Sequence, residues 1–346
     1  MSKLRTEGRC VIRLLLLVVA FLSVRVCNAQ DPQFSLQDAA PLLLNPALAG
    51  ADAQYRATLQ YRNQWSALGD PFTTTAGSFD MALHQNPGAR KQPKGKPAFG
   101  VAFLTDRSGQ PRIAYSQVNL NAAYHVHLTR NSTLGAGFYT GFASQSIDPA
   151  SGQWGSQYNG MQFDPQLDHG EDLTTLLRTQ LDFGGGVVYS YRKKALTNSP
   201  VAERAMNVGL AIYHMGTVSL GRDDFFDDPM PMRWSAFVNW VYQPHTEAPA
   251  IMPGVYFHQH GAARMIMMGS NVRFRLKNAS PRLPDTKNIG FTLGAFYRTG
   301  DAIIGKVLLE WDAFDVGLAY DVNVSGLSRH SSGRGAAEVM LRYRIN

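Results

Sequence analysis

The sequence has little cysteine and little charge, and its one long apolar run stands at the start. Both cysteines, Cys10 and Cys27, lie among the first 29 of 346 residues. Only 17% of the residues are charged, against about a quarter in a typical soluble domain. Past the N-terminus no run of about 18 apolar residues could cross a bilayer as a helix. The mean hydropathy of −0.19 argues against a polytopic helical membrane protein. A hydrophobic content of 45% excludes a disordered chain.

The first 29 residues predict a secretory signal peptide. Four basic residues precede an apolar core over 14–22, and residues 27–29 place small side chains before a cleavage site at Gln30. Lipidation of Cys27 is disfavoured because Arg25 stands where such a site needs a small or apolar residue. Cleavage removes both cysteines, which excludes a disulfide, a thiol nucleophile and a cysteine metal site. It also lowers the formal net charge from +7 to +3, and no basic stripe remains to bind nucleic acid.

From Tyr55 onward, apolar and polar residues alternate with the period of a β-strand. In 314–322 the even-numbered residues are aliphatic or aromatic, and the odd-numbered ones are Asp, Gly or Ala. The same period recurs in 118–128, 181–192 and 338–345. A large apolar face opposite a charged, glycine-rich face is more typical of a transmembrane β-barrel than of a water-soluble sandwich. Because hydrocarbon satisfies no backbone hydrogen bond, spanning strands must close on themselves.

The alternating segments number about fourteen, an even count as bacterial barrels have. They are expected to begin near Tyr55, Thr73, Pro97, Ile113, Thr133, Gln180, Met206, Met232, Ala250, Met265, Asn288, Ala302, Phe314 and Ala337. The predicted fold is therefore all-β: a transmembrane antiparallel β-barrel over residues 55–346. A periplasmic, plug-like N-terminal segment over 30–54 and the signal peptide over 1–29 precede it.

The connections divide between two sides once the N-terminus is placed in the periplasm. Three loops are then expected outside the cell: 146–178, 216–231 and 323–336. Three basic connections are expected in the periplasm: 84–96, 193–205 and 275–287. The basic three are longer than periplasmic turns usually are. Either they contact a periplasmic partner, or the strand count is off by one.

Candidate metal and catalytic groups are sparse. Four aspartates in 223–228 could hold Ca²⁺, but their spacing is not that of an EF-hand. His258 and His260 share one strand face and could bind zinc, but no third ligand is visible. No spacing of Ser and His predicts a nucleophile and its base. The glycines of 184–186 lack the Lys-Ser/Thr that follows a phosphate loop, so close packing or a strand kink explains them. We expect no enzyme, no cofactor and no metal.

Charged residues on the predicted lumen face leave two interpretations open. They could form internal ion pairs, or they could line a path for solutes. These residues are Arg56, Arg62, Asp182, Arg192, Lys306, Glu310, Asp321 and Arg342.

Short blocks at both ends of the mature chain carry a family resemblance. Near its start are the blocks 30–35 (QDPQFS), 45–50 (NPALAG), 61–65 (YRNQW) and 78–80 (SFD). Near its end are the blocks 298–302 (RTGDA), 319–323 (AYDVN), 325–327 (SGL) and 333–335 (GRG). This order closely resembles the PorP/SprF family, outer-membrane proteins of the type IX secretion system of Bacteroidota. The blocks bracket nearly the whole mature chain.

The resemblance implies a fold, a location and partners. It implies an outer-membrane barrel of about fourteen strands that supports export and surface retention of a large adhesin with a C-terminal sorting domain, as in gliding motility. The implied partners are that adhesin, other type IX secretion components including periplasmic ring proteins, and outer-membrane lipid, with no nucleic acid. The positions that carry the family pattern, and are candidates for partner binding, are Asn45, Pro46, Gly50, Arg62, Gln64, Trp65 and Asp321.

The sequence departs at two places from the pattern that this resemblance implies. The chain ends in Ile345-Asn346 rather than the aromatic residue that barrels commonly present for assembly, and loop 146–178 matches no family block. The turn residues of 45–50 let the segment fold back under or into the barrel, and Trp65 is expected at the outer interface. These residues either seat the N-terminus or contact a partner.

Two other functions compete with the secretion role. One is a general or substrate-specific channel, and the other is a barrel hydrolase. The hydrolase is disfavoured because the sequence shows no catalytic group.

Overall fold

The computed structural model describes most of the chain. It covers residues 32–66, 71–83, 95–109, 113–147, 152–168, 176–193, 203–219, 230–245, 248–277, 289–326, 328–331 and 333–345. The expected signal peptide and the acidic stretch 223–228 lie outside the described residues. Among the described residues, no helix has the length and apolar character needed to cross a membrane.

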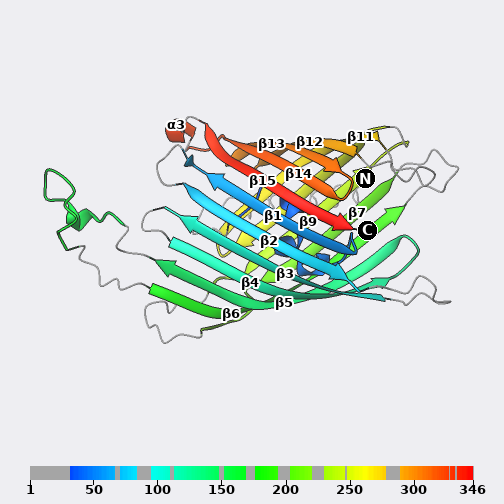
Figure 1. Ribbon diagram of the computed structural model, residues 1–346, viewed down its shortest axis with the longest axis horizontal. Helices are drawn as coiled ribbons and strands as arrows, with labels where there is room; N and C mark the ends of the chain where they lie inside the picture. Colours follow the sequence, from blue (N-terminus) through cyan, green and yellow to red (C-terminus); the bar gives the residue numbers. More distant parts are fainter. Residues whose placement is uncertain are drawn as a thin grey trace, which may run out of the picture.

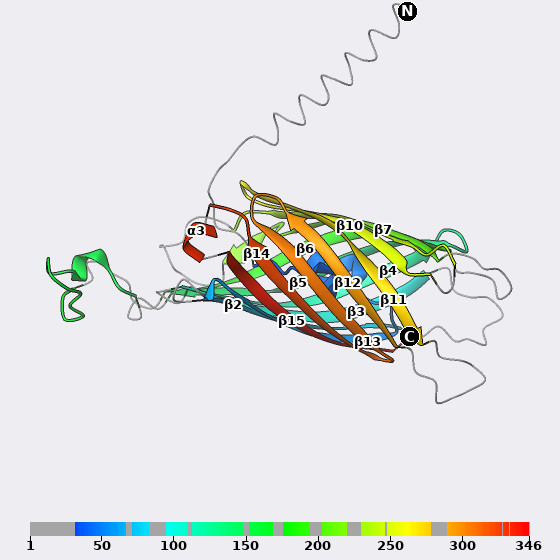
Figure 2. The ribbon, with the colours of Figure 1, turned by 90° about the horizontal axis from the view of Figure 1, so that it is seen from above.

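Fourteen strands of the described residues form a closed ring (Figures 1 and 2). They are β1 (Tyr55–Gln64), β2 (Phe72–Ala82), β3 (Gly95–Ser108), β4 (Ile113–His127), β5 (Ser132–Ile147), β6 (Leu176–Lys193), β7 (Arg204–Tyr213), β9 (Arg233–Tyr242), β10 (Ala250–His260), β11 (Ala263–Lys277), β12 (Ile289–Arg298), β13 (Ala302–Trp311), β14 (Phe314–Asn323) and β15 (Arg334–Ile345). A three-residue strand, β8 (Thr217–Ser219), adds to the edge of β6.

Every strand pairs antiparallel with its neighbours around the ring. β1 pairs with β15 over its whole length, from Tyr55 opposite Ile345 to Gln64 opposite Ala336. β5 pairs with β6, which completes the circuit on the other side. We call the end of the barrel that holds Tyr55 and Ile345 the terminal end, and the opposite end the far end.

The prediction of a fourteen-strand antiparallel barrel is confirmed. The largest difference in a strand start is at β6, which begins at Leu176 rather than near Gln180 because its pairing with β5 extends to Ile147. The strand β8 was not predicted, since three residues are too few to show a period. The count was therefore not off by one.

The ends of the barrel separate the connections as predicted. The strand order places 146–178, 216–231 and 323–336 at the far end, with the short helices η5 (Gly155–Gln157) and α3 (Ser328–Ser331). It places the strand ends that flank 84–96, 193–205 and 275–287 at the terminal end. Most residues of these last three connections lie outside the described residues, so the basic turns stay a prediction.

The two faces of the wall have opposite chemistry. On β14 exposure alternates residue by residue: Leu318 is 52% exposed on the outer face, and Asp321 is 1% exposed in the lumen. Large apolar side chains dominate the exposed outer face of the described strands, and aromatic ones such as Trp311 and Tyr343 stand near the terminal end. An apolar band with aromatic borders suits a bilayer, whereas the inner residues need polar partners.

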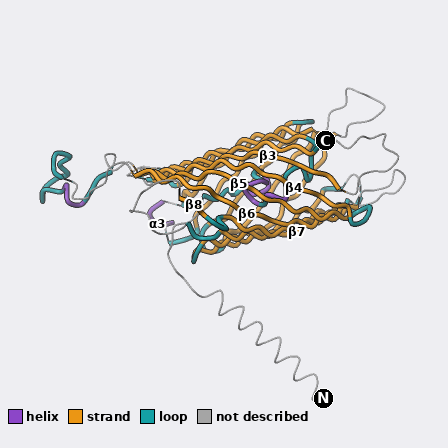
Figure 3. The backbone as a smooth tube through the Cα atoms, turned by 90° about the horizontal axis from the view of Figure 1, so that it is seen from below, coloured by secondary structure: helices purple, strands orange, loops and turns teal. Residues whose placement is uncertain are grey.

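Residues 32–54, which we call the inner segment, lie within the ring (Figure 3). Three short helical turns shape the segment: η1 (Gln37–Ala39), α2 (Pro41–Leu44) and η2 (Pro46–Leu48). Pro41 and Pro46 each open a turn, where a missing N–H costs nothing. The side chain of Asn45 caps η2 by accepting a hydrogen bond from the N–H of Ala47.

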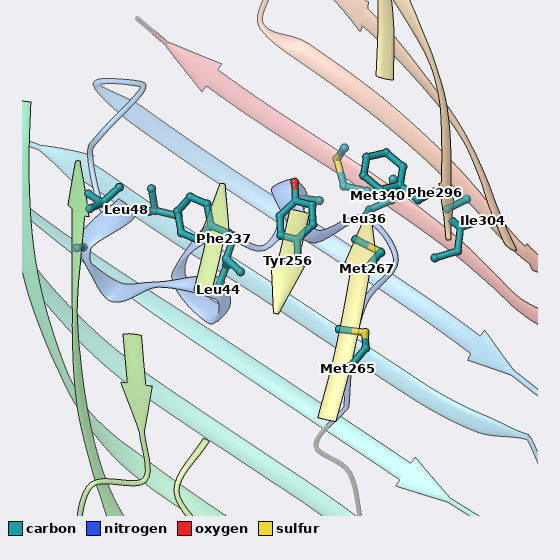
Figure 4. Packing of buried hydrophobic residues seen from close by; sticks show 14 residues of the cluster. Leu36, Leu44, Leu48, Phe237, Tyr256, Met265, Met267, Phe296, Ile304 and Met340 are labelled. Carbon is teal, nitrogen blue, oxygen red and sulfur yellow. The ribbon is translucent and has the colours of Figure 1, made fainter. Parts of the chain in front are cut away.

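The main core of the described residues joins the inner segment to the wall. Leu36, Leu44 and Leu48 pack in one buried cluster with Phe237 and Met340 of the strands (Figure 4). Burial of a leucine side chain contributes about 1.5–3 kcal/mol. The apolar residues of the segment thus have their partners inside the barrel.

Closure of the wall predicts heat-modifiable mobility. An unheated detergent sample should migrate differently on a denaturing gel from a boiled sample, because a closed hydrogen-bonded ring unfolds only on heating. The boiled aliquot is the control. Identical mobility of both samples, with recovery of the protein in the soluble periplasmic fraction, would contradict the membrane barrel.

Candidate functional site

The polar lumen and the inner segment meet first at a cluster of buried charges. Arg62 donates hydrogen bonds to Ser35 Oγ (2.7 Å), Glu338 Oε2 (3.1 Å) and Asp321 Oδ2 (2.8 Å). Arg298 donates to the same oxygen of Asp321. Ser35 completes the group, since its backbone N–H donates to Glu338 (2.6 Å) and its hydroxyl to Asp321 (2.7 Å). We call these five residues the Arg62 cluster.

The Arg62 cluster ties four strands to the inner segment. Arg62 comes from β1, Arg298 from β12, Asp321 from β14 and Glu338 from β15, while Ser35 comes from the segment. Two guanidinium groups balance two carboxylates. Buried charges are stable only when they are paired and hydrogen-bonded, so removal of Ser35 would leave both carboxylates short of a donor.

A second contact places Asn45 against the backbone of the wall. Its amide nitrogen donates to the carbonyl oxygens of Val187 (3.1 Å) on β6 and Leu210 (3.0 Å) on β7. A Cβ atom on Gly186 would lie 2.3 Å from the Asn45 side-chain oxygen. Gly186 is therefore explained by this close approach, and Gly184 by another, since a Cβ on it would lie 2.2 Å from the ring of Tyr139.

The third contact holds the end of the inner segment. Gly50 has a φ of 60°, and a Cβ on it would lie 2.6 Å from that of Ala98, so both backbone and space require glycine here. Its N–H donates to Asp80 Oδ2 (2.7 Å). Arg56 bonds both oxygens of Asp80 (2.9 and 3.0 Å) and also donates to the carbonyl of Leu48 (3.0 Å).

Further hydrogen bonds join the segment to the remaining wall. Tyr256 donates to Asp38 (2.6 Å), and Ser235 donates to the carbonyl of Leu44 (2.9 Å). On the other side, the His125 ring lies 2.7 Å from the carbonyl oxygen of Ala49. Bonds from β1, β4, β9, β10 and other strands thus surround the segment.

The seven residues predicted as a site do not form one group. Asn45, Pro46 and Gly50 lie on the inner segment, and Arg62 and Asp321 share the Arg62 cluster. The other two lie at the far end of β1. There Gln64 is 3.4 Å from the guanidinium of Arg62. Trp65 has a φ of 58° and packs edge-on against Phe72, with 4.9 Å between ring centres.

The lumen charges form internal ion pairs. Arg342 donates to Asp315 (2.8 Å) and Arg273 donates to Glu310 (2.8 Å). Arg192 donates to Asp52 (3.1 Å) in an exposed pair. Asp182 lies 2.9 Å from a ring nitrogen of His214. Lys306 differs, because its ammonium lies over the ring of Phe296, 3.7 Å from the ring centre. Arg56 and Arg62 pair as described above.

Sequence reasoning missed four members of these contacts: Ser35, Asp80, Arg298 and Glu338. The first three stand inside the family blocks 30–35, 78–80 and 298–302, so block membership was the available signal. Glu338 occupies a lumen-facing position of the last strand, which alternation alone indicated. No pattern in the sequence indicated that strands from the start and the end of the chain meet at Ser35.

The histidine pair does not form a metal site with its neighbours. His258 lies 3.2 Å from the side-chain oxygen of Gln37, and the ring of His260 lies 5.9 Å from that of His214. Among the described residues, no three His, Cys, Asp or Glu side chains come together as metal ligands. The candidate calcium site at 223–228 falls outside them.

A cavity of about 750 Å³ lies between the inner segment and the terminal end. Its inner surface includes Leu36 and Leu44 of the segment, and its lining reaches Glu203 and Arg344 near the rim. We call this cavity the vestibule. The segment therefore forms part of the wall of the vestibule.

The contact at Asn45 predicts a difference between two glycine substitutions. Gly186→Val should lower the temperature at which the folded barrel in detergent converts to the gel mobility of the unfolded chain. The valine side chain would displace Asn45 from its place against the wall. Overpacking of this kind costs about 1–3 kcal/mol. Gly305→Val is the matched control, since no atom lies within 4 Å of its Cβ position. Equal conversion temperatures for both variants would contradict the contact.

Comparison with solved structures finds several chains of low identity. The toluene transporter TodX of P. putida is 12% identical, with 89% of this chain and 94% of that chain covered and a TM-score of 0.43. A FadL homologue of Pseudomonas aeruginosa is 9% identical, with 87% and 93% covered and a TM-score of 0.42. The translocator domain of the autotransporter NalP from Neisseria meningitidis is 10% identical, with 85% and 89% covered and a TM-score of 0.39. These values carry no functional argument.

Comparison with curated protein sequences gives no match. The family described as type IX secretion system membrane protein PorP/SprF matches residues 26–343. That range includes the inner segment with Asn45 and Gly50, and every strand of the ring up to the last two residues of β15. The chain therefore belongs to the PorP/SprF family of type IX secretion system membrane proteins.

Proposed function

We propose that this protein is a non-enzymatic outer-membrane barrel that supports export and surface retention of a large adhesin with a C-terminal sorting domain. The observation that carries the proposal is the family match over residues 26–343, which covers all but the last two residues of the wall. The outer band of large apolar side chains suits the outer membrane. Residues 1–29 act as the signal peptide for export, and other type IX secretion components are partners.

In this proposal the inner segment is a plug. The Arg62 cluster, Asn45 and Gly50 hold it at three separated places on the wall. A general channel would need a continuous polar path, and the lumen charges here are used in ion pairs and in bonds to the segment. The plug interpretation thus favours a binding barrel over the rival channel.

The far end supplies the surface for the adhesin. Within loop 146–178, residues 152–168 form a small unit of their own, in which Tyr158 pairs with Phe163 and the Gln157 amide donates to the carbonyl of Leu167. Met161 at its tip is 91% exposed. An apolar tip on an ordered unit suits contact with another protein. In this orientation the terminal end faces the periplasm.

The plug predicts a low solute flux that rises when the Arg62 cluster is weakened. In liposome swelling with small sugars, the native barrel should give little flux and Asp321→Asn a raised one. The amide leaves Arg62 and Arg298 facing a neutral group, and breaking a buried pair costs about 3–5 kcal/mol. Asp301→Asn is the control, because Asp301 also bonds Arg298 (2.7 Å) but is 36% exposed. High flux through the native barrel would favour the channel.

The secretion role predicts a specific partner in native cells. A photo-crosslinking amino acid at Met161 should capture a large adhesin with a C-terminal sorting domain. The same amino acid at Arg130, in the exposed turn between β4 and β5 at the terminal end, is the matched control and should not capture the adhesin. Recovery of only lipopolysaccharide and assembly factors at Met161 would argue against the secretion role.

A further inference from the structure

The vestibule combines an apolar inner end with a cationic wall. Leu36, Phe237 and Met340 line its inner end, and Arg342 and Arg344 line the side formed by β15. Both arginines face inward, because lumen-facing residues of β15 are the even-numbered ones. Their Cα atoms are about 6–7 Å apart along the strand. The cavity volume is of the size that small-ligand sites have.

One positive charge in this wall lacks a carboxylate of its own. Arg342 and Arg344 share Asp315, with Arg342 Nε at 2.8 Å and Arg344 Nε at 3.3 Å from the same oxygen. The other four arginines of the lining each have an acidic partner of their own. The pairs are Arg56 with Asp80, Arg192 with Asp52, Arg273 with Glu310, and Arg275 with Glu203. Lys306 stands deeper, in the field of Asp38 and the Arg62 cluster, so its charge balances Asp38. Asp312 also lines the cavity but is exposed in the turn between β13 and β14, so the two arginines at Asp315 are the ones that share a single carboxylate.

Two polar side-chain atoms of residues in the lining make no hydrogen bond within the described residues. Thr292 is 6% exposed, and its hydroxyl makes no hydrogen bond within the described residues. The side-chain oxygen of Asn239 is buried and likewise makes none there. Both residues line the vestibule. A buried polar group without a partner costs about 1–3 kcal/mol, so a ligand with N–H and C=O groups is favoured over a plain acyl chain.

We propose that the vestibule binds the free carboxyl-terminal end of a polypeptide that enters from the terminal end. Its carboxylate pairs with Arg342 and Arg344, whose planar guanidinium groups suit a carboxylate. The last side chain, an apolar one, packs against the inner end at Leu36 and Met340. The backbone of the preceding residues meets Asn239 and Thr292. This site lies at the opposite end from the loops proposed for the adhesin, so it goes beyond that function.

The test compares an acid with an amide. Fluorescence polarisation with the purified full-length barrel in detergent uses a labelled hexapeptide that ends in leucine with a free carboxylate. Saturable binding is expected, at least about tenfold weaker for the C-terminal amide and salt-sensitive for the acid, since charge-assisted hydrogen bonds contribute more than neutral ones. Equal affinity for acid and amide, or no saturable binding up to millimolar peptide, would overturn the proposal.

Variants locate the site within the cavity. Arg344→Gln should weaken binding of the acid about tenfold, and Arg192→Gln, a control at the same rim whose arginine has its own partner, less than twofold. Ala205→Trp should abolish binding with every charge intact, because buried Ala205 also lines the vestibule. Should Arg344→Gln not assemble, the acid–amide comparison and Ala205→Trp decide. Saturable binding of a free fatty acid where the peptide shows none would assign the cavity to acyl chains and overturn the proposal.

Discussion

The pairing of β1 with β15 is the constraint on which the rest of the structure depends. Ten residue pairs, from Tyr55 opposite Ile345 to Gln64 opposite Ala336, join the first strand to the last. In hydrocarbon an open sheet edge would leave backbone groups without partners, so the wall is stable in a membrane only as a ring. Closure fixes which residues face inward, and it gathers Arg62, Asp321 and Glu338 from three adjacent strands at one level of the lumen. The polar lumen is thus a consequence of closure, and its charges must find partners there.

The inner segment supplies hydrogen-bond partners for the charged side chains of the lumen. It does so better than water would, because its N–H and O–H donors are held at fixed positions. Ser35 supplies a hydroxyl and a backbone N–H to two carboxylates, and Gly50 supplies an N–H to Asp80. The wall in turn adapts to the segment. Gly186 leaves room for the Asn45 side chain, and the glycine at 50 gives the backbone a φ that other residues rarely adopt. Segment and wall therefore specify each other, and neither set of polar groups is satisfied alone.

The barrel could be predicted from the sequence, whereas the geometry of its interior could not. Alternation reports the face on which each residue lies, and so it gave the fourteen strands and the inward position of Asp321 and Arg342. Alternation does not show which inward side chains lie close together in the lumen. The contacts of Ser35 with Glu338 and of Arg298 with Asp321 could therefore not be predicted. The strand β8 could not be predicted because three residues are too few to show a period. The seven predicted site residues do not form one group because Gln64 and Trp65 lie at the rim, whereas Asn45 is buried inside the barrel.

The two ends of the barrel differ in shape, and the inner segment contributes to this difference at the terminal end. The segment leads into β1 at the terminal end, and its apolar residues Leu36 and Leu44 line the vestibule. A cavity closed by apolar groups and bordered by Arg342 and Arg344 favours anionic ligands with an apolar end. The far end instead carries the long strands β5 and β6 and the unit at 152–168, which project away from the lumen (Figure 1). One fold thus presents a recessed surface on one side and a projecting surface on the other, which is an arrangement suited to a protein that contacts different partners at its two ends.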